Sequence, residues 1–500
     1  MRALSLNQPN PTIWQPDLIY ADRAFLRDRE IACNDAGEIV SIEGVNRVEN
    51  RIPIKNRAAL PGLVNAHSHA FQRVIRGRTE YRTANSKDSF WTWREMMYRA
   101  AMRLTPEDIY DASRMAFLEM ALSGITSVGE FHYLHHGPNG SQYDDPNLLA
   151  KEVVRAAQDV GLRIALLRVA YARSGFETET NPRQARFIED DPDVYLQNVE
   201  QLSADLKRGS SPTVGEGVSI RDSALPHGRA TAPAWVGLAP HSVRAVSLDY
   251  LKAIVPFGNE QGMPIHMHVA EQPAEVSACI QEYGRSPIAL LETEGLLSDR
   301  FTAVHAIHVT PKAIATIARA RAMVCACPTT ERNLGDGVFP ADRYFQNGVR
   351  VALGTDSHVE INLMEDAREL EYNLRLQKIE RVVLDVVEDS TTTEQRFDGA
   401  SALAARLFEC ATVHGAASIN SPGGVLETGH AADFFTIDLD DPSLAGATED
   451  DLLASVVFSL SRTAIKDVVV GGRRIVEDGR HAQQEDIVQK FQSLQKKLWR

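Results

Sequence analysis

The sequence predicts an α/β protein in which a (β/α)8 barrel is joined to a small β domain built from both ends of the chain. Between residues 59 and 415, short apolar runs alternate with longer helical patterns, as in a series of βα units. Short β-rich segments lie before and after this part. No G-x-G-x-x-G motif opens the series, so about eight βα units favour a closed barrel with insertions over an open, doubly wound sheet.

The first 58 residues contain short alternating segments, such as residues 24–26 and 38–42, separated by turn residues. They predict small antiparallel strands, which are too few to bury a good core by themselves. Helical patterns in the barrel part include residues 113–121 and 148–160. The predicted barrel strands are the run that starts at residue 60 and residues 125–128, 163–169, 235–238, 264–269, 303–305, 323–326 and 350–353.

After residue 415 the pattern returns to strands, at residues 432–437 and 467–476. Gly471 and Gly472 separate two β-rich runs and predict a hairpin. Apolar residues at helical spacing predict a terminal helix over residues 485–500. The predicted domains are therefore a discontinuous small β domain (1–58 and 416–482), the barrel (59–415) and a C-terminal helix (483–500).

Residues 206–233 are rich in Gly, Ser, Pro and Thr and show no helical period, which predicts a long loop inserted before a strand. This loop is either a mobile surface insertion or a lid or subunit contact. Because it directly precedes residues 235–244, it could displace side chains there.

The charge balance limits the partners. The chain has 53 Lys and Arg residues against 67 Asp and Glu residues, a formal net charge of -14, so we expect no nucleic acid and no anionic membrane as partner. A small anionic substrate would need local arginines. Five cysteines without a C-x-x-C pair, and neither a signal peptide nor a stretch of about 18 apolar residues, predict a cytoplasmic protein.

The first chemical motif is His67-Ser68-His69, at the end of an apolar run. On a strand, residues i and i+2 point to the same side, so the two imidazoles converge as half of a zinc site. Three further motifs follow later strands in order: His268 with Glu271 three residues on, then His305, then Asp356 in Gly-Thr-Asp-Ser. Barrel enzymes build their active sites at such strand ends.

Together these motifs resemble the amidohydrolase superfamily, in the branch that uses one metal ion for hydrolytic deamination. The resemblance covers nearly the whole chain and implies a metal-dependent amidohydrolase type of barrel. It implies one divalent ion, zinc in the first place although iron and manganese compete for such sites, with ligands His67, His69, His268 and Asp356. His266 faces the same way as His268, and we interpret it as lying behind the ligands.

Such a site has a clear chemical logic. Three imidazoles and a carboxylate leave an open position on zinc, where a bound water can supply hydroxide near neutral pH. Glu271 can take the proton of this water and give it to a leaving amine. His305 can hold the hydroxide and stabilise charge on the tetrahedral intermediate, and Asp356 can share the proton transfers.

Within that superfamily the chain is similar to the formimidoylglutamate deiminase family, on residues 70–73, 88–99, 129–136, 239–246 and 333–340. This family converts N-formimidoyl-L-glutamate and water to N-formyl-L-glutamate and ammonia in histidine degradation. Arg94 and Arg244 would pair with the two carboxylates. Gln72 would bind the formimidoyl nitrogen, and Tyr133 and His241 would complete the carboxylate pockets.

Alternatives stay open at this point. Another deaminase of the same branch, acting on guanine or a related heterocycle, would share the metal ligands, and a non-catalytic barrel scaffold would need none. A homodimer is also consistent with the sequence. His132, His135 and His136 are a weaker candidate for a second metal cluster, and we expect residues 91–98 and the pair Cys325 and Cys327 to pack as wall and core.

Overall fold

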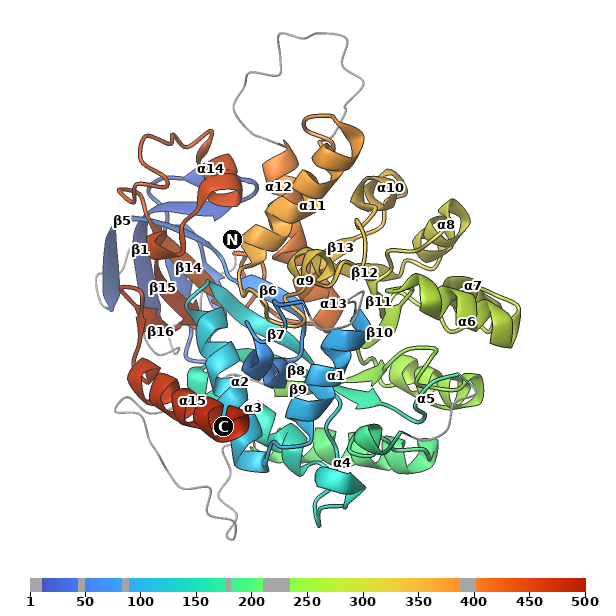
Figure 1. The fold of residues 1–500 in the computed structure, drawn as a ribbon. Helices are drawn as coiled ribbons and strands as arrows, with labels where there is room; N and C mark the ends of the chain where they lie inside the picture. Colours follow the sequence, from blue (N-terminus) through green and yellow to red (C-terminus); the bar gives the residue numbers. More distant parts are fainter. Residues whose placement is uncertain (1–10, 44–49, 83–89, 177–180, 210–233, 386–401) are drawn as a thin grey trace.

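The computed structural model describes residues 11–43, 50–82, 90–176, 181–209, 234–385 and 402–500. Its centre is a sheet of eight parallel strands in sequence order, which confirms the predicted barrel (Figure 1). A parallel bridge between Ser68 and Asp356 joins the first strand to the chain after the last and closes the barrel. The strands are β6 (Leu63–Ser68), β7 (Ile125–His132), β8 (Arg163–Ala170), β9 (Ala234–Pro240), β10 (Ile265–Val269), β11 (Phe301–His305), β12 (Met323–Ala326) and β13 (Val351–Leu353).

Helices surround this barrel (Figure 1). They are α1 (Phe90–Ala101), α2 (Pro106–Ala121), α3 (Leu148–Val160), α4 (Pro192–Gly209), α5 (Leu248–Glu260), α6 (Pro273–Tyr283), α7 (Pro287–Thr293), α8 (Pro311–Arg319), α9 (Pro328–Leu334), α10 (Ala341–Gln346), α11 (Leu363–Lys378), α12 (Ala402–Cys410) and α13 (Val413–Ile419). The predicted helix 148–160 is confirmed. The helix predicted from residue 113 begins earlier, because Thr105 and Asp108 form a capping box with Pro106 at the first position.

The two chain ends form one antiparallel-rich sheet beside the barrel, as predicted. Its path is β17-β16-β15-β14-β5-β1-β3-β4, and β2 pairs with β1. The N-terminal strand β5 lies between β1 and the C-terminal strand β14, which joins the two ends of the chain. The strands are β1 (Thr12–Ala21), β2 (Ala24–Leu26), β3 (Ile31–Cys33), β4 (Ile39–Ser41), β5 (Arg51–Pro61), β14 (Phe434–Asp438), β15 (Ile465–Val470), β16 (Arg473–Glu477) and β17 (Arg480–His481).

Details of this sheet differ from the sequence prediction in two places. Strand β5 continues to Pro61, beyond residue 58, and a helix, α14 (Leu452–Ser459), interrupts the C-terminal strands. The hairpin at Gly471 and Gly472 is confirmed, with φ of 55° and 70°. Two successive positive φ values fit a tight turn between twisted strands, where glycine is preferred.

The chain ends in α15 (Gln484–Trp499), which buries Ile487, Phe491, Leu494 and Leu498 as its spacing predicts. It lies against α2, where Lys497 Nζ contacts the Asp108 carboxylate at 2.6 Å. Of the predicted loop 206–233, residues 206–209 are instead the last turn of α4, and the remainder lies outside the described residues. Among the helices of the described chain, none combines the length and apolarity that crossing a membrane requires.

Candidate metal centre and substrate cavity

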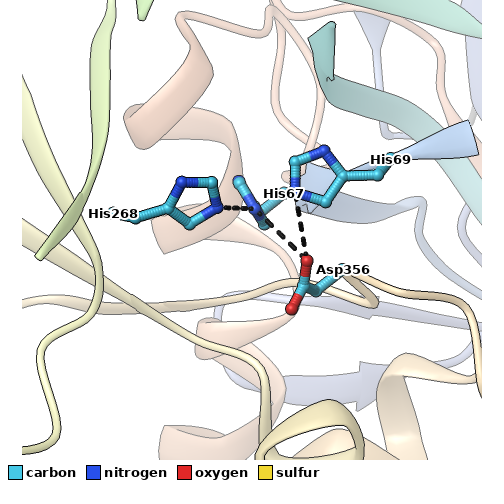
Figure 2. A group of neighbouring side chains, drawn as sticks. All are labelled: His67, His69, His268 and Asp356. Carbon is cyan, nitrogen blue, oxygen red and sulfur yellow. Dashed lines mark hydrogen bonds and ion pairs between the residues drawn. The ribbon is translucent and has the colours of Figure 1, made fainter. Parts of the chain in front are cut away.

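The four predicted metal ligands meet at the carboxyl ends of the barrel strands (Figure 2). His67 lies on β6 and His69 directly follows it, His268 lies on β10, and Asp356 follows β13. One ligand atom from each lies within 4.8 Å of the others. Asp356 Oδ1 lies 3.2 Å from His69 Nε2 and 3.5 Å from His67 Nε2. His268 Nε2 lies 3.1 Å from His67 Nε2.

A glycine permits this convergence. A Cβ built on Gly354 would lie 2.7 Å from the Cβ of His67, closer than real Cβ atoms approach. Without a side chain there, the end of β13 lies against β6, and the backbone N–H of Asp356 donates to the carbonyl of His67 at 3.0 Å. The Gly-Thr-Asp motif thus brings Asp356 to the His67–His69 pair.

The donor set fits a divalent cation. His69 Nδ1 lies 2.8 Å from the carbonyl of Phe131, and His268 Nδ1 lies 3.0 Å from the carbonyl of His241. These contacts place the protons on Nδ1, so that each Nε2 presents a bare lone pair to the centre. Burial also lowers the pKa of His67 to about 3, so its ring is neutral. Three imidazoles and a carboxylate that face one point are a donor set suited to a divalent cation.

Glu271 and His305 lie beside this centre. His305 Nε2 is 3.8 Å from Glu271 Oε1 and 3.8 Å from Asp356 Oδ2. Burial raises the pKa of Glu271. Burial opposes charge on His305, but the carboxylates of Glu271, Glu331 and Asp356 outweigh it and raise the pKa of His305 well above its ordinary value. The carboxyl group of Glu271 and the imidazole of His305 therefore face each other beside the candidate metal ligands.

The backbone is strained at these strand ends. Ala270, His305, Ala306 and Asp356 are all in the left-handed region, with φ of 52°, 65°, 48° and 44°. Residues other than glycine adopt this region at a cost, and such strain concentrates at functional sites. Here it turns the chain sharply after β10, β11 and β13, where Glu271, His305 and Asp356 are presented.

Two carboxylates that the sequence pattern does not single out also support the site. Glu331 Oε1, on α9, accepts from the backbone N–H of Cys327 at 2.9 Å and lies 3.3 Å from His305 Nδ1. Glu275, on α6, accepts from the backbone N–H groups of Ala270 and Glu271 at 3.2 and 3.3 Å. Both follow a barrel strand within a few residues, and this position was the only signal that could have identified them.

Two interpretations of histidines change. His266 does not lie behind the ligands: its Nε2 is 2.8 Å from the carbonyl of Ser418 on α13, a helix that packs against the start of β6. His135 and His136 each contact a backbone carbonyl through Nε2, at 2.8 and 3.0 Å. Within the described residues, neither they nor His132 belong to a group that could hold an ion, so a second cluster there is wrong.

A cavity adjoins the metal ligands, and all five predicted substrate-binding residues line it. Gln72 comes from the turn after β6, Arg94 from α1, Tyr133 from the end of β7, and His241 and Arg244 from the loop after β9. The remaining wall includes Tyr98, Tyr171 and Phe187, with Glu271 and His305 at the metal side. Arg94 also lies over the ring of Tyr98, 5.4 Å from its centroid.

Gln72 has one amide atom already engaged. Its Nε2 donates to the hydroxyl of Tyr133 at 2.8 Å, whereas its Oε1 is buried and has no hydrogen-bond partner among the residues that the structure describes. A buried acceptor without a donor is costly unless a ligand supplies one. Gln72 therefore offers an acceptor for an N–H group inside the cavity.

Comparisons with known proteins agree with this architecture. Residues 58–475 match the model of the Amidohydrolase family. The formimidoylglutamate deiminase of Pseudomonas aeruginosa is 37% identical over 87% of this chain and 88% of its own length. The crystal structure of an amidohydrolase from Brucella melitensis superimposes with a TM-score of 0.84 and 31% identity, covering 98% of this chain and 100% of that one. An adenosine deaminase from Xanthomonas campestris, solved with bound zinc, has the same fold, with a TM-score of 0.76, 20% identity and coverage of 98% and 99%.

Proposed function

Since the chain belongs to the amidohydrolase family, whose members are hydrolases, we propose that it hydrolyses N-formimidoyl-L-glutamate to N-formyl-L-glutamate and ammonia, a step of histidine degradation. The observation that carries this proposal is one cavity that joins a three-histidine, one-aspartate centre to two arginines. The arginines supply cations for two carboxylates in a chain whose net charge is -14.

His67, His69, His268 and Asp356 would hold one divalent ion, zinc by the nature of the donors. When bound, such an ion lowers the pKa of the attacking water so that hydroxide is available near neutral pH. Glu271 accepts the proton of that water and delivers it to the nitrogen that leaves as ammonia. His305, held 3.8 Å from both Glu271 and Asp356, would stabilise negative charge on the oxygen that the water adds to the formimidoyl carbon.

The other cavity residues orient the substrate. Arg94 and Arg244 pair with its carboxylates, and Tyr133 and His241 complete their surroundings. Gln72 Oε1, buried and without a donor, accepts from an N–H of the formimidoyl group. These contacts would place the formimidoyl carbon next to Glu271 and the metal ligands, which lie on the same cavity wall.

The test is ammonia release by purified, metal-analysed protein. N-formimidoyl-L-glutamate is compared with guanine and adenosine, and a chelator-treated sample serves as the control. Fast release from the formimidoyl substrate, lost with the chelator and accompanied by N-formyl-L-glutamate, is the expected result. Release from guanine or adenosine instead would establish a heterocycle deaminase. A protein that contains no metal and turns over none of these substrates would favour the alternative of a non-catalytic barrel scaffold.

A further inference from the structure

Two tyrosines and a glutamine form a hydrogen-bonded trio at the arginine side of the cavity. Tyr171 directly follows β8, and Tyr98 lies on α1. Gln184, from a short 3-10 turn (Pro182–Gln184), is almost fully buried behind them. Its Nε2 donates to the hydroxyl of Tyr98 at 2.8 Å and also contacts the hydroxyl of Tyr171. Both tyrosines line the cavity.

This trio has more protons than it can use internally. The amide nitrogen of Gln184 has two N–H groups, and the two hydroxyl oxygens accept them. Each hydroxyl therefore keeps its own proton, and among the described residues no carboxylate or carbonyl accepts the one on Tyr171.

The surroundings of Tyr171 favour an anion as that acceptor. Tyr171 lines the same cavity as Arg94 and Arg244, and Arg94 lies over the ring of its partner Tyr98, 5.4 Å from the centroid. Guanidinium groups are donors only. An oxygen that enters this corner and carries negative charge would accept from the hydroxyl and from the arginines together.

We propose that Tyr171 is a further specificity-determining residue, held in place through Gln184, which also contacts Tyr98. Its hydroxyl group donates a hydrogen bond to a carboxylate of the substrate. The inference rests on the proposed function, because it adds the Tyr171 hydroxyl to Arg94 and Arg244 as a donor for the carboxylates of that substrate. A neutral or monocarboxylic ligand that leaves this corner empty gains nothing from Tyr171.

The variant Tyr171→Phe tests this with little change in packing, because its ring lies 5.7 Å from Phe187 and 4.7 Å from His241 and these contacts remain. A hydrogen bond to a charged group is lost, so we expect KM to rise about 10- to 100-fold with kcat within about threefold of the original. Gln184→Leu removes the amide that holds the hydroxyls of Tyr98 and Tyr171, so this variant should also raise KM. Tyr195→Phe is the matched control, since the buried Tyr195 hydroxyl donates to the carbonyl of Arg168 at 2.6 Å outside the cavity and its loss should leave KM unchanged.

Calorimetry on the metal-loaded protein separates this inference from the proposed function. The probes are N-formyl-L-glutamate and its two monocarboxylic analogues, each lacking a different carboxylate. The expected result is that Tyr171→Phe weakens binding of the dicarboxylate and of one analogue but not of the other. Unchanged binding of the dicarboxylate, or equal weakening for all three probes, would overturn the inference alone. No binding of the dicarboxylate to the unsubstituted protein would overturn the proposed function and the inference with it.

Discussion

Two buried polar clusters of the barrel differ in how their groups are satisfied. On β8, the fully buried Arg168 donates to both oxygens of Glu189 at 2.5 and 2.9 Å and to Asn147 Oδ1 at 2.8 Å. Asn198 donates a further hydrogen bond to Glu189 at 2.8 Å. In the metal cluster, by contrast, three imidazoles and Asp356 present acceptors to one another. Matched donors and acceptors characterise a structural cluster, whereas converging acceptors require a ligand.

Removal of an imidazole from the metal cluster, set against removal of a buried imidazole outside it, should break this comparison most strongly. We expect His268→Ala to lose the bound metal and to lower kcat/KM by about 10⁴-fold or more, because the ion supplies both the nucleophile and several kcal/mol of charge stabilisation. His135→Ala removes a buried ring whose Nε2 lies 2.8 Å from the carbonyl of Val169, and this variant should keep one metal ion per chain. Elemental analysis together with ammonia release measures both effects, and metal retained by His268→Ala would contradict the assignment.

The next largest effect separates the metal ligands from the proton carrier beside them. Glu271→Gln should retain the metal and lose about 10²- to 10⁴-fold in kcat. Glu271 must be ionised to accept a proton, so kcat/KM falls as the pH falls through its pKa. Because burial raises this pKa above the ordinary 4.5, the fall should begin at a higher pH than for an exposed carboxyl group. The residual activity of the variant should lack that acidic limb, and a pH profile of both proteins checks it.

In the structural cluster the expected effect is on stability rather than on turnover. Arg168→Met leaves Glu189 buried without its cation and should lower the free energy of unfolding by about 3–5 kcal/mol. The arginine and its neighbours hold the pKa of Glu189 at about 2, so the native protein keeps this stabilisation near neutral pH and loses it as the pH falls from 4.5 towards that value. Denaturant titration measures the change, and Arg168→Met combined with Glu189→Leu should recover part of it. Equal stability of Arg168→Met and the parent would refute the assignment.

The barrel was predictable because its strands are uniformly apolar and periodic in the chain. The metal ligands could be located because each lies near the end of such a strand or shortly after it, so that fold and site share one signal. His266 shows where this reasoning fails. Alternation predicts the face of the strand to which a side chain points, but not which end of the barrel it reaches. His266 is only two residues before His268 on β10, yet its side chain contacts Ser418 on α13. The matched cluster at Arg168 and Glu189 was not predictable, since its partners come from separate elements and only the folded chain brings them together.

The carboxylates that support the site illustrate the same limit. Glu331 and Glu275 each act through a neighbour, by contacting His305 or the backbone at Glu271. Nothing in their local sequence distinguishes them from acidic residues in the first turn of any helix, where such residues are common. Their role becomes visible only when strand ends are close enough for side chains to meet.

The smallest expected effect lies in the cavity, where the arginines contribute to binding but not to the reaction at the metal. Arg244→Met should raise KM for N-formimidoyl-L-glutamate about 10- to 100-fold, because a charged hydrogen bond to a carboxylate is lost. Formamidine carries the same reacting group without carboxylates, so its kcat/KM should be unchanged in the variant. A proportional loss with both substrates would mean that Arg244 maintains the metal site itself. A loss confined to the dicarboxylate would show that Arg244 acts through a carboxylate of the substrate, whereas Arg168 acts through Glu189 of the protein itself.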